Sequence, residues 1–337
     1  MKKHWRTLLG FGISAIFLYY ALRGLDLKEV GYWLTQATYY WLIPAVAIYF
    51  VGVWVRTWRW HYMLRPIKPI ATRRLFPIVC IGYMGNNIFP LRAGEVLRAY
   101  VLKRSEEVSM SSSLATIVVE RVFDGLVMLM FVFFALPFAP MPANLRPFVI
   151  FPSLFFLALL VMFVLLATKP DLAQLLYRQT VRRLLPANFR LKVDGFIERF
   201  LEGLHFFRSG RDIMMVFLIS VVIWLAETMK YWFVMQAFVQ FGSGLPVAFY
   251  VLMLMNGIVN LATTLPSAPG YIGTFDTPGI EVLSAYGVSR SLAAGYTLVL
   301  HAALWFPITI LGAWFFRREQ LTWSDVESAR QQRAQVA

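Results

Sequence analysis

The chain has 337 residues, of which 59% are hydrophobic and 15% charged, and it carries a net charge of +14. Soluble domains are about a quarter charged, and no soluble core could bury this much apolar surface. The composition therefore excludes an ordinary soluble protein and predicts a single membrane domain. The positive charge does not require nucleic acid as a partner, since Lys and Arg gather in the cytoplasmic loops of membrane proteins and meet anionic lipid headgroups there.

Six apolar stretches approach the ~20 residues that cross a hydrocarbon core. The first follows Lys2 and Lys3 and resembles a signal peptide, but no small-residue cleavage site precedes Arg23, so we interpret it as an uncleaved span. The predicted full spans are residues 5–22, 39–60, 112–137, 147–167, 212–240 and 291–316.

Basic residues orient these spans in an inner or cytoplasmic membrane. Lys2 and Lys3 place the N-terminus inside, and the weakly basic loop 23–38 is then outside. The six basic residues within 56–74 and the nine within the loop 168–211 lie inside. Both termini are therefore predicted to be cytoplasmic.

Two further apolar stretches, 75–91 and 248–263, run directly into segments rich in Pro, Gly and polar residues. If 75–91 crossed the membrane fully, Lys103 and Arg104 would lie outside and the basic loop 168–211 would follow them. The positive-inside rule is obeyed when each stretch turns within the membrane and returns to the side from which it came. The alternative is eight full spans with a weak charge bias.

The predicted fold is all-α and integral to the membrane, with about six full transmembrane helices and two re-entrant helical hairpins at 75–104 and 248–286. The half 147–316 then repeats the half 1–137 upside down. Inverted repeats with interrupted helices are typical of transporters. The membrane domain covers 1–318, and 319–337 forms a polar cytoplasmic tail.

The segment 189–207 within the cytoplasmic loop has apolar residues at helical spacing and charged residues largely elsewhere. This pattern is typical of a helix that lies in the membrane interface. A soluble helix packed on the loops is an equally good interpretation.

The two hairpins share a polar pattern: an Asn, then Pro-x-x-x-Gly, then an acidic residue. Pro and Gly break a helix inside the membrane, and the freed backbone groups need protein or a water-filled cavity around them. With the neighbouring side chains they could bind a polar headgroup or an ion, although a kinked helix pair without a ligand is the simpler alternative. The candidate residues are Asn86, Asn87, Pro90, Arg92, Gly94, Glu95 and Arg98 in the first hairpin, and Asn260, Pro266, Gly270, Gly273 and Asp276 in the second.

Charged residues inside two predicted spans extend this candidate site. Each costs about 2.5–3.5 kcal/mol on insertion scales, so such residues pair with one another or line a cavity. They are Glu120, Arg121, Asp124, Glu227 and Lys230. Arginine forms a planar fork that suits phosphate, so we expect Arg92, Arg98 and Arg121 to contact an anionic headgroup. Glu227 and Lys230 could instead be a self-paired structural couple, and the carboxylates could serve proton coupling or acid–base chemistry.

Cofactor and metal chemistry is not expected. The single cysteine, Cys80, and the four histidines do not form a ligand cluster. The sequence also lacks a Gly-x-Ser-x-Gly nucleophile motif and a phosphate-binding Walker loop. An ATP-driven pump or a nucleophilic hydrolase is therefore disfavoured.

Three ordered motifs resemble the lysylphosphatidylglycerol synthase transmembrane region family, which is also described as flippase-like. They are Asn87-x-x-Pro90-x-Arg92-x-Gly94-Glu95-x-x-Arg98, Glu120-Arg121-x-x-Asp124 and Pro266-x-x-Pro269-Gly270-x-x-Gly273. The resemblance covers nearly the whole chain and implies an inner-membrane protein that moves or presents lipids or lipid-linked sugars. The synthase that gives the family its name has a soluble aminoacyl-transfer domain after this region. We expect no lysine transfer here, because about twenty residues follow the last predicted span.

Three functions remain open at this point. A flippase or lipid-binding translocator, with a membrane lipid or lipid-linked substrate, is favoured. A non-catalytic scaffold of a lipid or glycan assembly pathway would instead have membrane or cytoplasmic partner proteins. A lipid-modifying enzyme would use Glu95, Glu120 or Asp124 as acid or base. The pattern fixes neither the lipid, the energy source nor the oligomeric state.

Overall fold

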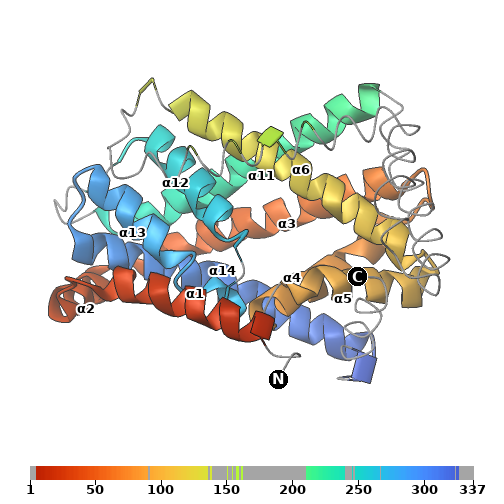
Figure 1. Ribbon diagram of the computed structural model, residues 1–337, viewed down its shortest axis with the longest axis horizontal. Helices are drawn as coiled ribbons and strands as arrows, with labels where there is room; N and C mark the ends of the chain where they lie inside the picture. The colour runs from red at the N-terminus through yellow and green to blue at the C-terminus, as the bar shows by residue number, and fades with distance from the viewer. Residues whose placement is uncertain are drawn as a thin grey trace.

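The protein is described by a computed structural model in which every regular element of the described part is a helix (Figure 1). The described residues are 5–89, 92–135, 210–239, 247–265 and 267–322, with residues 137–138, a few positions between 150 and 161, and residues 245 and 324–325. The predicted span 147–167 lies largely outside this part. The amphipathic segment 189–207 and both hairpin prolines, Pro90 and Pro266, lie outside it entirely.

Five long helices coincide with predicted spans. They are α1 (Trp5–Leu22), α3 (Leu42–Leu64, after the short η1 at Tyr39–Trp41), α6 (Met110–Ala135), α11 (Gly210–Gln236) and α14 (Arg290–Arg318). Within the described residues, Tyr39–Leu64, α11 and α14 are long and apolar enough to cross a membrane. α6 has 26 residues and is also mostly apolar, but Glu120, Arg121 and Asp124 interrupt it near the middle.

The two segments predicted as hairpins are helices interrupted by a break. In the first, α4 (Thr72–Ile88) and α5 (Ala93–Glu106) pack antiparallel, with Gly85 against Gly94 and Gly82 against Arg98. In the second, α12 (Phe249–Ala262) leads through the one-turn helix η5 (Pro269–Tyr271) to α13 (Asp276–Ala285).

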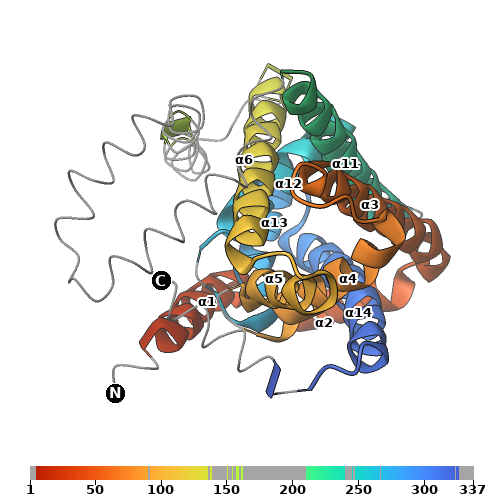
Figure 2. The ribbon, with the colours of Figure 1, turned by 90° about the vertical axis from the view of Figure 1, so that its right-hand side faces the viewer.

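The broken helices pack on long helices from the opposite half of the chain (Figures 1 and 2). α4 lies along α14, α12 lies along α6, and α3 lies along α11 between them. Two glycines allow the first two contacts to be close: a Cβ on Gly312 of α14 would lie 2.5 Å from the Cys80 carbonyl oxygen, and one on Gly257 of α12 would lie 3.2 Å from the Met128 carbonyl oxygen.

Apolar side chains lie on both the inside and the outside of the molecule. Buried clusters surround each broken segment, with Trp60 and Leu97 near the first and Tyr296 and Leu254 near the second. Large apolar side chains such as Ile310 are also exposed on the long helices. An apolar exterior over long helices is what a lipid-facing surface requires.

One helix was not predicted. The sequence indicated an external loop at 23–38, whereas residues Leu27–Gln36 form α2. The side chain of Asp26 caps it by accepting hydrogen bonds from the Lys28 and Glu29 backbone amides at 2.8 and 3.3 Å. The amphipathic α2 packs against α14.

The start of the polar tail is attached to α5. Asp325 accepts a hydrogen bond from the Tyr100 hydroxyl at 3.0 Å and pairs with Arg104 at 2.8 Å. Burial raises the pKa of Asp325, but hydrogen bonds from Thr322, Tyr100 and Arg104 outweigh burial and lower it to about 2. This carboxylate therefore stays ionised at neutral pH and keeps its contacts with α5.

Candidate functional site

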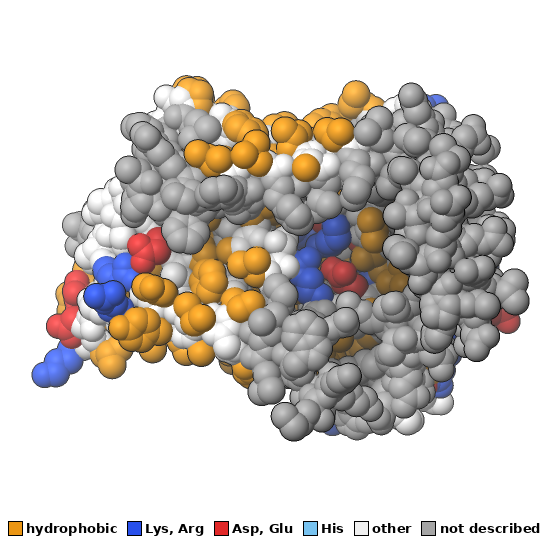
Figure 3. All heavy atoms as spheres, in the orientation of Figure 1, with side chains coloured by type: hydrophobic (Ala, Val, Ile, Leu, Met, Phe, Trp, Pro, Cys, Tyr) orange, Lys and Arg blue, Asp and Glu red, His pale blue; other side chains and the backbone are white. Residues whose placement is uncertain are grey.

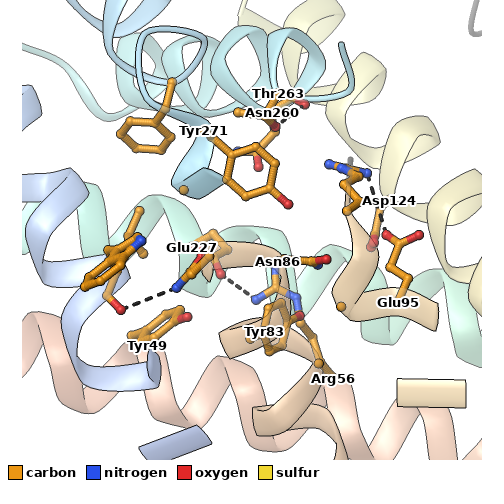
Figure 4. A pocket seen from close by; sticks show the side chains of 18 of the residues that line it. Tyr49, Arg56, Tyr83, Asn86, Glu95, Asp124, Glu227, Asn260, Thr263 and Tyr271 are labelled. Carbon is orange, nitrogen blue, oxygen red and sulfur yellow. Dashed lines mark hydrogen bonds and ion pairs between the residues drawn. The ribbon is translucent and has the colours of Figure 1, made fainter. Parts of the chain in front are cut away.

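A cavity of about 160 Å³ lies where the two helix breaks meet, among α3, α4, α5, α6, α11, α12, η5 and α14. Figure 4 shows its wall, with Glu95, Asp124, Glu227 and Arg56 arranged around the open space. Twelve of the residues predicted from sequence line it: Asn86, Asn87, Arg92, Gly94, Glu95, Arg98, Arg121, Asp124, Glu227, Lys230, Asn260 and Gly270.

The first break places α5 at the edge of the cavity. The chain leaves α4 extended at Phe89, and Arg92 takes a left-handed conformation with φ 53° immediately before α5 begins. Gly94 must be glycine, because a Cβ there would lie 1.9 Å from the Gly82 carbonyl oxygen. This close contact brings Glu95 and Arg98, in the first turns of α5, to the cavity wall.

The second break is a tight turn stabilised by α1 and α14. Gly270 and Gly273 have φ of +71° and +82°, which favour glycine. The Ala268 backbone amide donates to the Ser14 hydroxyl of α1 at 2.8 Å. On the other side, the His301 ring of α14 lies 2.7 Å from the Gly270 carbonyl oxygen and 2.7 Å from an Asp276 carboxylate oxygen.

Two ion pairs at the cavity wall are buried and fully formed. Arg59 binds Asp124 through two hydrogen bonds of 2.7 and 3.3 Å, and Trp224 donates to the same carboxylate at 3.0 Å. Arg98 binds Glu120 in a bidentate pair of 2.8 and 2.9 Å. These geometries satisfy both carboxylates, so the two pairs are well suited to hold α3, α5, α6 and α11 together.

A third buried cluster lies across the cavity on α11. Glu227 accepts hydrogen bonds from both Arg56 and Lys230. The Lys230 ammonium also lies 4.7 Å from the ring centroid of Tyr49, and Arg56 lies 5.3 Å from that of Trp224. One carboxylate thus faces two basic groups, and aromatic faces provide the rest of their surroundings.

Arg92, Glu95 and Arg121 are held much more loosely. Glu95 is 3.8 Å from both arginines, which is too long for a hydrogen bond. Arg121 also lies 3.2 Å from an Asp124 carboxylate oxygen, and the Nε atoms of Arg92 and Arg121, like those of Arg59 and Arg98, are buried without a hydrogen-bond partner. Their side chains are 27% and 34% exposed, and Figure 3 shows basic and acidic side chains together in a hollow near the middle of one face.

The charges of the cluster do not cancel. Among the described residues, six basic side chains (Arg56, Arg59, Arg92, Arg98, Arg121 and Lys230) face four carboxylates (Glu95, Glu120, Asp124 and Glu227) in these contacts. The cluster therefore has a formal charge of +2. Arg92 has the weakest partner, a carboxylate 3.8 Å away, whereas Arg121 shares Asp124 with Arg59 at 3.2 Å.

The model of the lysylphosphatidylglycerol synthase TM region family matches residues 7–312. The chain belongs to this family. Its relatives include the UPF0104 membrane protein MJ1595 of Methanocaldococcus jannaschii, which is 25% identical over 89% of this chain and 91% of its own length. PH1989 of Pyrococcus horikoshii, also a UPF0104 membrane protein, is 23% identical over 93% and 96% of the two lengths. Family and apolar helices together identify a membrane protein.

A shorter part of the chain is similar to part of a glycosyltransferase. The glycosyltransferase AglD of Haloferax volcanii is 36% identical over 89 residues, which are 25% of this chain and 14% of that protein.

Three more of the site residues predicted from the sequence lie near the cavity without lining it. Glu120 is behind Arg98, to which it is bound. Gly273 and Asp276 are behind the second turn, where the Gly273 amide donates to Asp276 at 2.8 Å. Pro90 and Pro266 are outside the described residues.

The sequence analysis missed part of the cavity wall. Arg56 and Arg59 were counted as cytoplasmic charges, but both are buried within α3 and pair with α11 and α6. Their spacing of three residues, which places both on one helix face, was the available signal. The remaining missed residues of the wall are mostly aromatic. They are Tyr49, Val79, Gly82, Tyr83, Trp224, Tyr231, Thr263, Tyr271, Phe275, His301, Leu304 and Trp305.

Polar side chains without charge connect each break to a neighbouring helix. Asn87 of α4 donates to Thr309 of α14 at 2.8 Å, and Asn256 of α12 donates to Thr228 of α11 at 3.0 Å. No group of three His, Cys, Asp or Glu side chains suited to a metal ion occurs in the part of the chain that the structure describes.

Proposed function

We propose that this protein is a flippase or lipid-binding translocator whose central cavity binds the anionic headgroup of a lipid or lipid-linked substrate. The observation that carries the proposal is the cluster charge of +2 together with the exposure of Arg92 and Arg121, which line the cavity with side chains that are 27% and 34% exposed. A guanidinium with free donors binds phosphate oxygens through its planar fork.

The size of the cavity favours a headgroup over a whole lipid. Its volume of about 160 Å³ is roughly five times the ~30 Å³ that one water occupies in the liquid. A phosphate with a small substituent fits such a space, whereas acyl chains have to remain in the membrane beside the protein. This division between a polar site and an external apolar tail is what lipid translocation needs.

The packing of the two halves supports an inverted repeat of re-entrant hairpins. α4 packs on α14 and α12 packs on α6, which is the exchange expected when two halves are related by a pseudo-two-fold axis. In such a repeat, rocking one half against the other exposes a central site to each side in turn. We place this protein in the inner membrane with both termini in the cytoplasm, as the basic loops predict.

The contacts make acid–base catalysis by Glu120 or Asp124 the weakest alternative. Each carboxylate is bound by an arginine through two hydrogen bonds and is buried, which leaves little access for a substrate proton. Presentation of a lipid-linked substrate to a partner enzyme is the second candidate. The similarity of 89 residues to the glycosyltransferase AglD favours it.

Leaflet exchange in reconstituted vesicles tests the proposal. Fluorescent phosphatidylglycerol and phosphatidylcholine are added to phosphatidylcholine vesicles with and without protein, and dithionite accessibility is followed. We expect protein-dependent exchange of the anionic probe, lost in the double variant Arg92→Gln, Arg121→Gln and kept in Arg317→Gln, which changes an exposed arginine outside the cavity. Equal exchange by wild type and the double variant contradicts the proposed headgroup site.

A further inference from the structure

The His301 ring has a hydrogen-bond acceptor beside each of its two nitrogens. Nδ1 is 2.7 Å from Asp276 Oδ1, and Nε2 is 2.7 Å from the carbonyl oxygen of Gly270. A carbonyl only accepts hydrogen bonds, so Nε2 must carry a proton. The contact between Nδ1 and the carboxylate requires a second proton, which resides on either partner.

Both placements of the second proton give the same total charge. An imidazolium beside an ionised Asp276 is neutral overall, and so is a neutral imidazole beside a protonated carboxyl. Asp276 Oδ2 already accepts from the Gly273 amide at 2.8 Å, which leaves Oδ1 for His301. Loss of one proton to water in the cavity leaves a charge of −1 on the pair and removes the hydrogen from one of its two short contacts.

The His301–Asp276 pair is joined to the cavity through the second turn. His301 and Gly270 line the cavity, and the next residue, Tyr271, has the Arg92 guanidinium 5.8 Å from its ring centroid. Gly270 is also packed against Trp305 of α14, whose indole nitrogen would lie 2.8 Å from a Cβ at that position. A change in the His301 contact therefore acts on the turn that adjoins one of the two loosely held arginines.

The other ionisable groups that face the cavity from helices packed on α14 are less suited to exchange a proton. Glu227 is bound by Arg56 and Lys230, and each of these cations has that carboxylate as its partner. The remaining groups are phenol hydroxyls. These neighbours are Tyr49 and Arg56 from α3, Tyr83 from α4, and Glu227, Lys230 and Tyr231 from α11.

We propose that His301 and Asp276 form a proton-binding site coupled to the headgroup site, so that the protein takes up a proton with the anionic headgroup and releases both together. This inference rests on the proposed translocation and supplies it with a proton gradient as an energy source. The sign follows from the charges: the neutral pair tolerates a bound anion, whereas the pair at −1 repels it. Linkage makes the effect reciprocal, so headgroup binding also favours proton uptake.

Two substitutions fix the pair in its two states. Asp276→Asn keeps an oxygen for the Gly273 amide and offers an N–H to His301 Nδ1, which imitates the protonated pair at every pH. His301→Gln removes the titrating ring and leaves the Asp276 charge in place, which imitates the deprotonated pair. His61→Gln is the matched control, because His61 contacts the Ile70 carbonyl oxygen and does not line the cavity.

The experiment measures binding of fluorescent phosphatidylglycerol to the purified full chain in zwitterionic detergent between pH 5 and pH 9. We expect wild type and His61→Gln to bind roughly tenfold more weakly at pH 9 than at pH 6, within the usual range of coupling between sites. Asp276→Asn should bind tightly and His301→Gln weakly, both without pH dependence. An unchanged pH dependence in both variants overturns the inference.

A second readout separates this inference from the proposed function. In a variant with His4, His61 and His205 changed to Gln, the ¹⁵N signals of the remaining ring report whether both nitrogens of His301 carry protons. We expect a doubly protonated or proton-sharing ring near neutral pH that loses one proton within the range measured. A ring with one proton throughout, together with an Asp276 carboxyl ¹³C signal that does not change with pH, overturns the proton site, whereas wild type that binds no phosphatidylglycerol at any pH contradicts the headgroup site instead.

Discussion

Both broken helices turn through a residue in the left-handed conformation, Arg92 in the first and Gly270 in the second, but the side chains around the two breaks differ. At the first break, between α4 and α5, the contact is helix against helix, and the side chains delivered to the cavity are charged and loosely paired. At the second, neutral polar groups and the His301–Asp276 pair hold the turn, and Ser14 of α1 closes its outer side. In the proposed function, the first break binds the headgroup and the second controls the geometry around it.

The largest loss of folded protein is expected from a substitution at Gly94, where the close contact between α4 and α5 leaves no space for a side chain. Gly94→Ala places a Cβ 1.9 Å from the Gly82 carbonyl oxygen and 2.5 Å from the Asn86 amide nitrogen, so α4 and α5 must separate. We expect little folded protein, measured as the monodisperse fraction after detergent extraction. Gly12→Ala in α1 is the control, since nothing lies within 4 Å of its new Cβ. Equal yields from the two variants would show that the close α4–α5 contact is not needed.

The second-largest effect is a loss of thermal stability, and it distinguishes buried ion pairs that stabilise the fold from the more exposed pair of Arg92 and Glu95. Arg59→Ala leaves Asp124 buried without its main partner, and removing one member of a buried pair costs about 3–5 kcal/mol. Arg92→Ala removes a contact of 3.8 Å from a side chain that is 27% exposed, so its cost should be much smaller. Thermal unfolding in detergent checks the order. A larger loss from Arg92→Ala than from Arg59→Ala would reverse our assignment of roles.

Single cysteines on the surface should perturb the protein least. Their labelling shows on which side of the membrane each predicted hairpin begins and ends. In a Cys80→Ser background, a cysteine in place of Lys103, just after the first break segment, should react with an impermeant maleimide only from the cytoplasm. Cysteines in place of Lys28 and Ser289 should react from the outside. All three side chains are exposed, so access from water is not limiting. External labelling at 103 would mean that α4 crosses the membrane fully and that the hairpins are not related as an inverted repeat.

The sequence predicted the long helices well and their pairing poorly. Apolar runs reveal α3, α11 and α14, because lipid exposure demands continuous apolar surface. The amphipathic α2 was missed, since its stability depends on the Asp26 cap and on packing against α14. The polar motifs located both helix breaks, because Pro and Gly within an apolar run weaken a helix at that point.

The missed site residues depend on contacts that no local pattern encodes. Arg59 and Asp124 are 65 residues apart, and Arg56 and Glu227 are 171 apart, so a count of charges along the chain assigned both arginines to a loop. His301 had no motif around it, and its partner Asp276 is 25 residues away. Such partners are brought together only by the packing of α3 on α6 and α11 and of α13 on α14.

The most direct test of the central claim is a double substitution at the first break, Arg92→Ala with Glu95→Ala. Arg92→Ala alone combines two effects, because it removes the proposed headgroup contact and also weakens the pairing of Glu95. The double variant removes both charges, so membrane abundance should recover, and leaflet exchange of phosphatidylglycerol is measured at equal protein amounts. We predict normal abundance with exchange still lost. Full exchange by a well-expressed double variant would contradict the headgroup site and favour the scaffold.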